Sequence, residues 1–236
     1  MTKNGRKNNR KTFIFPILAL FSLAICSVLA LLLADGGEVI YELSQMNFIP
    51  NEKVVCIDAG HGGNDPGALG KNRQEKDDNL RLSLLVRDLL EERGYTVVMT
   101  RVDDSDVTLS ERCKIANKER ASLFVAIHRN SSSGGGKGME LWVHSSQPTD
   151  DTLLAENIME NLRTVGFSAD RGINFGYREG ENMNYYINRN TKMPSCLIEV
   201  GFITSDEDNK YFDEKLNEYA KAIADGIEQT LLEMNG

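Results

Sequence analysis

Three of the most apolar segments of this chain carry polar residues whose side chains can do chemistry. The segment VVCIDAGH ends on His61, the segment LFVAIH ends on His128, and the segment CLIEVGF places Glu199 among apolar residues. The chain has 3 histidines, so two of the three follow apolar segments of the same kind. Two imidazoles that meet at one edge of a sheet indicate a metal site. Zinc is the metal that we expect, because histidine and carboxylate side chains are common zinc ligands.

The third ligand could be Glu75, which directly precedes a predicted helix and would lie near the same sheet edge. Zinc sites that keep an open position usually have three protein ligands. Each of these residues also has a simpler interpretation. His61 could be a turn residue, Glu75 could interact with a helix dipole, and His128 could be a hydrogen-bonded residue at the end of a strand. His144, the remaining histidine, follows a segment that need not reach the site, and we expect it to be exposed.

Glu199 lies between Ile198 and Val200 in a run that is otherwise apolar. Burying a carboxylate costs free energy unless the group has a partner. One interpretation is a general base that activates a water molecule beside the metal. The other is a structural partner of a lysine or an arginine. Only the first interpretation requires the carboxylate to lie next to the metal site.

The glycine-rich segment 60–67, GHGGNDPG, follows the first of these apolar runs. It matches neither of the common phosphate-binding motifs, and it carries Asp65 but no lysine. We therefore do not expect a phosphate site. The glycines would instead let the backbone pass close to the ligand that His61 holds.

Strand and helix patterns alternate along the chain from Lys53 onward, which is typical of a single α/β domain. Apolar runs predict strands, and apolar residues at helical spacing predict helices. In open α/β sheets the ligand site lies beyond the carboxyl ends of the strands, so these strands would position the candidate residues. We expect strands at 54–58, 96–101, 123–128, 139–143, near 185–188 and at 195–200, and helices at 76–93, 108–120, 154–166 and 216–227.

The amino-terminal part differs from the rest of the chain. An uncharged and largely apolar run from Phe13 to Ala34 follows a basic segment at 1–12, and the first acidic residue is Asp35. Such a run is long enough to span a bilayer, and the preceding bases favour a cytoplasmic amino terminus. We therefore expect a transmembrane anchor at 13–34, a linker at 35–52 and a catalytic domain at 53–236 outside the cytoplasm. A cleaved signal peptide is the alternative, and it would make the protein secreted.

Charge argues against one class of partner. The chain has 27 basic and 35 acidic residues, a formal net charge of −8, and every acidic residue lies at or after Asp35. An acidic surface repels phosphate backbones, so we expect no binding to nucleic acid.

Cysteine spacing fits neither a disulfide framework nor a zinc finger. Cys26 lies in the apolar amino-terminal run, which leaves an odd number in the remainder, at Cys56, Cys113 and Cys196. We expect Cys56 and Cys196 to be small buried hydrophobic residues.

Five linked segments resemble the zinc-dependent N-acetylmuramoyl-L-alanine amidases of the amidase-3 family, from about Val54 to the carboxyl terminus. They are IDAGHGGNDPGALG, QEKDDNL with Glu75, TRVDDSDVTLSERCKIAN, LFVAIHRN and MPSCLIEVGFITS. The resemblance implies one α/β domain with a central, mainly parallel, twisted six-stranded sheet flanked by helices. It also implies one zinc ion on His61, Glu75 and His128, with Glu199 as the catalytic carboxylate. The substrate would be peptidoglycan, cleaved at the amide between the lactyl group of muramic acid and L-alanine.

Two departures from the family pattern concern structure more than chemistry. Asn188 lies where an apolar strand residue is usual, and Ser205-Asp206 replaces an Asn-Pro pair at a helix start. A short chain with one amino-terminal anchor is similar to the sporulation-specific members, which act in forming the muramic-δ-lactam of the spore cortex. Because an acidic surface does not promote binding to anionic wall polymers, targeting would rely on the anchor, the site itself or an unidentified protein partner outside the cytoplasm.

Two other functions remain open from the residues alone. One is a non-catalytic domain that binds peptidoglycan or a partner and holds a structural zinc with four protein ligands. The other is a zinc peptidase that cuts within the stem peptide.

Overall fold

The computed structural model describes residues 53–177 and 183–234 of the 236-residue chain. The predicted basic segment 1–12, the anchor at 13–34 and the linker at 35–52 lie outside the described residues. None of the helices in the described part combines the length and the apolar character that crossing a membrane requires.

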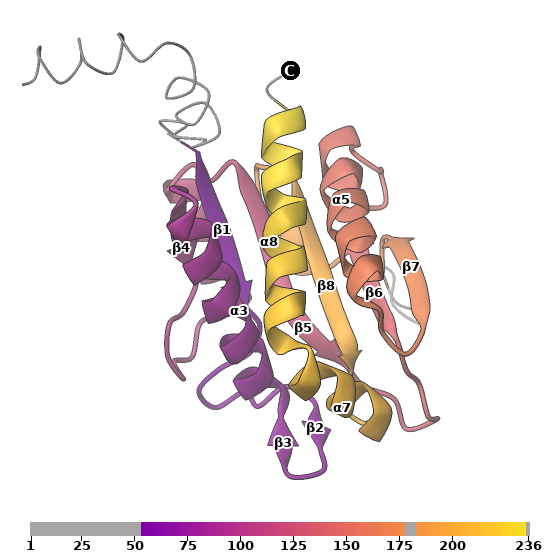
Figure 1. Ribbon diagram of the computed structural model, residues 1–236. Coiled ribbons are helices and arrows are strands. Elements are labelled where there is room, and N and C mark those ends of the chain that lie inside the picture. The colour runs from indigo at the N-terminus through magenta and orange to yellow at the C-terminus, as the bar shows by residue number, and fades with distance from the viewer. Residues whose placement is uncertain (1–52, 178–182, 235–236) are drawn as a thin grey trace, which may run out of the picture. The chain divides into compact units, whose positions relative to one another are not determined.

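A six-stranded sheet forms the centre of the described domain (Figure 1). Its strands lie in the order β4-β1-β5-β8-β6-β7. The first four are parallel to one another, β6 is antiparallel to β8, and β7 is parallel to β6. The expected six-stranded, mainly parallel sheet is therefore confirmed. The strands are β1 (Val54–Ala59), β4 (Thr96–Met99), β5 (Leu123–Asn130), β6 (Met139–Val143), β7 (Asp170–Phe175) and β8 (Ser195–Phe202).

Helices cover both faces of the sheet. The long helices α3 (Glu75–Glu92), α5 (Thr149–Val165) and α8 (Leu216–Glu233) lie side by side on one face (Figure 1), where their apolar side chains pack on strand residues such as Ile57 and Val125. The shorter helices α4 (Leu109–Lys118) and α6 (Tyr186–Asn190) pack on the opposite face, against Phe124 and Leu197. Helix α7 (Asp206–Glu214) follows β8, and a small hairpin of β2 (Leu69–Gly70) and β3 (Arg73–Gln74) precedes α3.

The predicted helix starts follow from local sequence. Thr108 and Glu111 form a capping box, in which each side chain accepts a hydrogen bond from the other residue's backbone N–H, and this fixes the start of α4. Ser205 accepts a hydrogen bond from the backbone N–H of Asp208 and caps α7, so the departure from the usual Asn-Pro pair still provides a helix start.

The strand predicted near 185–188 is wrong. Tyr186–Asn190 form the short helix α6, and the edge strand is β7 at Asp170–Phe175, which the sequence pattern did not predict. Asn188 accordingly lies on a helix, where its side chain donates a hydrogen bond to the carbonyl of Trp142. A helix of 5 residues is too short to show helical periodicity. The partly exposed β7 contains Gly172 at φ 73° and lacks a continuous apolar run.

The cysteines of the described part are free thiols and are buried. Cys56 lies on β1, Cys113 on α4 and Cys196 on β8, and each is at most 3% exposed. The expectation that Cys56 and Cys196 act as small buried hydrophobic residues is confirmed.

Candidate metal centre and adjacent pocket

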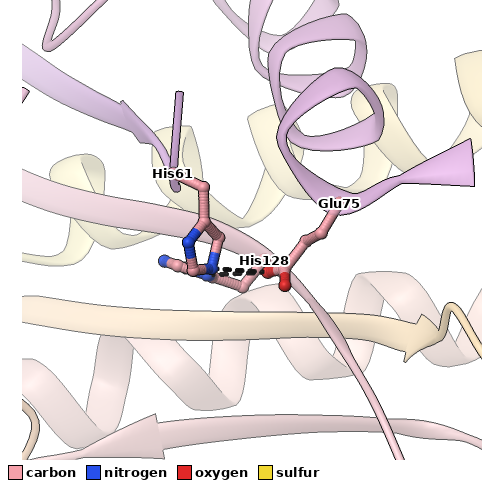
Figure 2. Close-up of side chains that lie close together, drawn as sticks. All are labelled: His61, Glu75 and His128. Atoms are coloured by element: carbon pink, nitrogen blue, oxygen red, sulfur yellow. Dashed lines mark hydrogen bonds and ion pairs between the residues drawn. The ribbon is translucent and has the colours of Figure 1, made fainter. Parts of the chain in front are cut away.

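The structure brings His61, Glu75 and His128 together at the carboxyl edge of the parallel strands (Figure 2). His61 follows β1, Glu75 is the first residue of α3, and His128 lies near the end of β5. One ligand atom from each residue lies within 4.8 Å of the other two. The juxtaposition that the strand ends predict is therefore present, although 53 positions separate Glu75 from His128.

The carboxylate of Glu75 lies between the two imidazoles. Its Oε1 atom is 3.2 Å from His61 Nε2 and 2.9 Å from His128 Nδ1 (Figure 2). The two rings meet edge to face, with centroids 4.9 Å apart and an interplanar angle of 82°. Two imidazole nitrogens and one carboxylate oxygen thus converge on one small volume.

Backbone and side-chain donors hold the Glu75 carboxylate in place. Its Oε2 accepts from the Ala68 N–H at 2.8 Å, and its Oε1 accepts from the Arg129 N–H at 3.1 Å and from Asn79 Nδ2 at 3.2 Å. Burial alone would raise the pKa of Glu75, but hydrogen bonds from both histidines lower it well below the usual range. Glu75 begins α3, so the helix dipole also favours its anionic form.

Asp65 orients His61 through the ring nitrogen that does not face Glu75. Its Oδ2 accepts from His61 Nδ1 at 2.7 Å, which leaves Nε2 facing Glu75. Its Oδ1 accepts from the Gly67 N–H at 3.0 Å, so the carboxylate is itself fixed. Ligating histidines commonly donate their second ring nitrogen to such a carboxylate, which sets the tautomer. We did not predict this role from the sequence, where the available signal was an acidic residue four positions after His61 in a tight turn.

Glycines allow the backbone to approach the three side chains. A Cβ at Gly67 would lie 2.7 Å from both Glu75 Oε2 and His61 Cδ2, and a Cβ at Gly60 would lie 2.2 Å from the His128 ring. Contacts this short are not tolerated, so only glycine fits at either position. The expected close approach of the loop to the site is confirmed.

Replacing Asp65 with asparagine should weaken metal binding by about 10- to 100-fold if His61 is a ligand, because an uncharged amide would orient and polarise its ring less well. Zinc affinity measured by competition with a chromophoric chelator checks this prediction. Asp104→Asn is the matched control, since Asp104 also bonds the loop, at the Gly63 N–H, but does not contact His61. Equal losses in the two variants would contradict the role given to Asp65.

Metal affinity should also rise with pH. Burial alone would lower the pKa of His61, but hydrogen bonds and charge interactions with Glu75 and Asp65 raise it to about 9. A metal ion bound through His61 would have to displace this proton, whereas Glu75, with its lowered pKa, is already anionic. Below about pH 9 the apparent affinity should therefore fall about tenfold for each unit of pH. Titrations with zinc chloride at several pH values test the slope, and a flat profile would show that His61 releases no proton.

Glu199 lies beside this group, in the same pocket. It is the residue of β8 that pairs with His128 of β5, and it is 3% exposed. The pocket has a volume of about 380 Å³ and is lined by both histidines, Glu75 and Glu199. Leu109 of α4, Tyr186 and Ile187 of α6, and the neighbouring Tyr185 are among the other residues that line it. Three of the residues for which the sequence predicted a strand, 185 to 187, thus line the pocket.

His144 lies apart from this site. It directly follows β6, and its ring nitrogens contact Ser146 and Asn184 rather than the other histidines. It does not line the pocket. It is half-buried rather than exposed as predicted, because Asn184 packs against it.

The fold and the site together define a class. Two imidazoles and one carboxylate converge at the carboxyl edge of the sheet of this α/β domain, beside a buried second carboxylate. Metal-assisted hydrolysis requires such an arrangement. Residues 55–229 match the family described as N-acetylmuramoyl-L-alanine amidase, and the chain belongs to that family.

Two proteins of Bacillus subtilis share this similarity. The chain is 38% identical over 210 residues to the uncharacterized protein YqiI of Bacillus subtilis, covering 88% of this chain and 95% of that protein. It is 35% identical to the sporulation-specific N-acetylmuramoyl-L-alanine amidase of the same organism, covering 74% of this chain and 67% of that protein.

Solved structures agree with the sequence comparison. The catalytic domain of CwlV, an N-acetylmuramoyl-L-alanine amidase from Bacillus (Paenibacillus) polymyxa, is 37% identical with a TM-score of 0.68, covering 76% of this chain and 98% of that one. The CwlD amidase of Clostridioides difficile, solved in complex with the GerS lipoprotein, is 32% identical with a TM-score of 0.63, covering 77% of this chain and 100% of that one. This chain is therefore an enzyme, an N-acetylmuramoyl-L-alanine amidase.

Proposed function

We propose that this amidase is zinc-dependent, that His61, Glu75 and His128 bind the zinc ion, and that Glu199 is the catalytic carboxylate. The observation that carries the proposal is the gathering of three ligand atoms within 4.8 Å of one another in the pocket that Glu199 also lines. The substrate is peptidoglycan, and the bond cleaved is the amide between the lactyl group of muramic acid and L-alanine of the stem peptide.

The donors suit zinc in kind and in number. Zinc binds imidazole nitrogen and carboxylate oxygen, and catalytic zinc sites use three protein ligands so that a fourth position stays open. Within residues 53–177 and 183–234, the group able to hold a metal ion consists of these three residues, without a fourth. This number favours a catalytic site over a structural one. The hydrogen bond from His61 to Asp65 supplies the outer contact that zinc-binding histidines usually have.

Glu199 would transfer the proton during the reaction. When bound, zinc supplies Lewis acidity that polarises an amide carbonyl and makes water a better nucleophile. Glu199 accepts a proton from the attacking water while the water oxygen bonds to the lactyl carbonyl carbon. The same carboxyl group then donates this proton to the alanine nitrogen as the C–N bond breaks. One water molecule is consumed, its second proton also ends on the alanine nitrogen, and a lactyl carboxylate and a protonated amino group are formed.

The pocket walls favour a substrate with small apolar groups near the reacting amide. Tyr185, Tyr186 and Ile187 form one side, and Leu109 and Leu197 contribute further apolar surface. The lactyl and alanine groups each carry one methyl group next to the scissile bond, and such groups fit an apolar wall with a few convergent polar residues.

Product analysis tests the reaction. We expect the purified full-length chain, incubated with sacculi and zinc chloride, to expose new L-alanine amino termini and to leave peptide-free glycan. A chelator should stop the release, and restored zinc should recover it. Alanine still attached to muramic acid would instead identify a peptidase acting within the stem peptide. Binding to sacculi without any cleavage would identify a non-catalytic domain.

The similarity to a sporulation-specific amidase and to CwlD supports a role in the spore cortex. In the source organism, loss of the gene should then remove muramic-δ-lactam from the cortex and leave the vegetative wall unchanged. A changed vegetative wall with an intact cortex would assign the enzyme to growth or cell separation instead.

The site of action follows from the substrate. Peptidoglycan lies outside the cytoplasmic membrane, so we place the catalytic domain, 53–236, there, attached through 13–34 or released by cleavage. Protease added to intact protoplasts should digest an anchored domain, and recovery of the protein in the medium would favour cleavage.

The solved complex of CwlD with the GerS lipoprotein supports a protein partner outside the cytoplasm. Full activity of the purified chain alone would argue that no partner is required.

A further inference from the structure

Two buried arginines lie beneath the loop that carries His61. Arg101 follows β4, and Arg112 lies on α4. Their exposed fractions are 4% and 3%. Neither guanidinium forms a hydrogen bond or an ion pair with the side chains of the three candidate ligands, and both donate mainly to backbone carbonyls.

Arg101 connects the two segments that carry His61 and Glu75. Its Nη2 atom donates to the carbonyl of Gly60 at 2.9 Å and to the carbonyl of Lys76 at 2.7 Å. Gly60 directly precedes His61, and Lys76 directly follows Glu75. Its Nε atom donates to the carbonyl of Ala59 at 2.8 Å. One planar group therefore fixes the end of β1 relative to the first turn of α3.

Arg112 holds the same loop from α4. It donates to the carbonyl of Ala59 and to the carbonyl of His61, each at 2.7 Å, and it forms an ion pair with Asp58 at 2.6 Å. The carbonyls of three consecutive residues, 59 to 61, are thus all bonded to buried guanidinium groups. His61 needs this support because its φ of 61° is unfavourable for a residue with a side chain.

A contribution to the stability of the fold does not by itself explain why the Arg101 guanidinium is buried here. Within residues 53–177 and 183–234 it has no ion pair with a carboxylate, and its hydrogen-bond partners are carbonyl oxygens of Ala59, Gly60, Lys76 and Asp103. The carboxylates of Asp58, Asp104 and Asp77 attract its charge without forming an ion pair with it, so no close anion offsets the cost of burying the guanidinium. What the guanidinium provides is geometry, because its fixed planar fork sets the spacing of the groups it bonds.

We propose that Arg101 is a positioning residue for the metal centre, whose bridge between the Gly60 and Lys76 carbonyls fixes the separation of His61 and Glu75 before a metal ion enters. This inference rests on the proposed zinc function. Asn79 makes a longer contact of the same kind, from α3 to the Gly60 carbonyl at 3.2 Å, and it reinforces the link.

The Arg101→Lys variant of the full-length chain tests the proposal. Lysine keeps the charge, but its single nitrogen cannot reproduce the planar fork that spans the Ala59, Gly60 and Lys76 carbonyls. We expect zinc affinity, measured with zinc chloride against a chelator, to fall about 10- to 100-fold. The visible absorption of the cobalt(II)-loaded protein should also change, because it reports ligand geometry independently of activity.

Two controls separate positioning from stability. Arg93→Lys makes the same chemical change at an ion pair with Asp225 and Glu228, and Leu162→Ala lowers stability from α5, which contributes no residue to the pocket. Both controls should keep wild-type zinc affinity. If Arg101→Lys binds zinc as tightly as the wild type, or loses no more affinity than an equally destabilised Leu162→Ala, the proposal is wrong. If the wild type itself binds no zinc, the proposed function fails instead.

Hydrogen exchange of the wild type keeps the test independent of whether the variant folds. In the metal-free chain, the hydrogen-bonded amides of Gly60, Ala68, Glu75 and Lys76 should already be protected, because the bridge orders both segments. Exchange at the unprotected rate without zinc, with protection appearing only when zinc is added, would overturn the proposal.

Discussion

Replacing Glu199 with glutamine should reduce hydrolysis of sacculi by about 10²- to 10⁴-fold, which is the range that a general acid–base group contributes. Glutamine keeps the shape of the side chain but cannot accept or return a proton. Because Glu199 is not one of the three proposed ligands, zinc should remain bound at one ion per chain. The measurements are the rate of L-alanine amino-terminus release and the zinc content of the same sample.

A second buried carboxylate provides the control for this variant. Glu140 of β6 pairs with Glu199 across the sheet and is 5% exposed. Both of its oxygens are occupied, since Oε1 accepts from Asn130 and Oε2 forms an ion pair with Arg171 at 2.7 Å. Glu140→Gln should therefore cost much less activity. Wild-type turnover in Glu199→Gln, or an equal loss in Glu140→Gln, would contradict the role of Glu199.

The second large effect concerns the histidines. His61→Ala and His128→Ala should each lose stoichiometric zinc on dialysis, and activity should fall to the background rate, because two remaining protein ligands are fewer than a catalytic zinc site uses. Zinc content by atomic absorption, measured beside the far-ultraviolet circular dichroism, separates loss of metal from loss of fold. His144→Ala is the matched control and should keep zinc, since His144 contacts Ser146 and Asn184 instead. Full zinc content in either test variant removes that residue from the ligand set.

The sequence predicts the parts of the fold that depend on burial. β1, β5 and β8 are covered on both faces, so their residues form nearly continuous apolar runs that stand out from the rest of the chain. Among the described residues, the edge strand β7 pairs with β6 alone and is partly exposed, so its sequence carries no such run. α6 follows from tertiary packing of Ile187 against the sheet, a contact that local sequence does not encode.

In the candidate site, too, the sequence predicts some features and not others. Residues at the ends of buried strands could be predicted to meet, because parallel strands place their carboxyl ends at one edge. The groups that orient them could not. Asp65 was visible as an acidic residue but gave no sign that its side chain turns toward His61, and Arg101 bonds carbonyls whose positions exist only in the folded chain.

The reactivity of the buried thiols would report local unfolding of the domain. Cys56, Cys113 and Cys196 come from the two parallel strands β1 and β8 and from α4, and an alkylating reagent can reach them only when those elements separate. Their individual labelling rates would give the free energy of opening for each element. Cys56 lies on the strand that leads into the His61 loop, so slower alkylation at this position when metal is added would measure how strongly ion binding closes that part of the molecule.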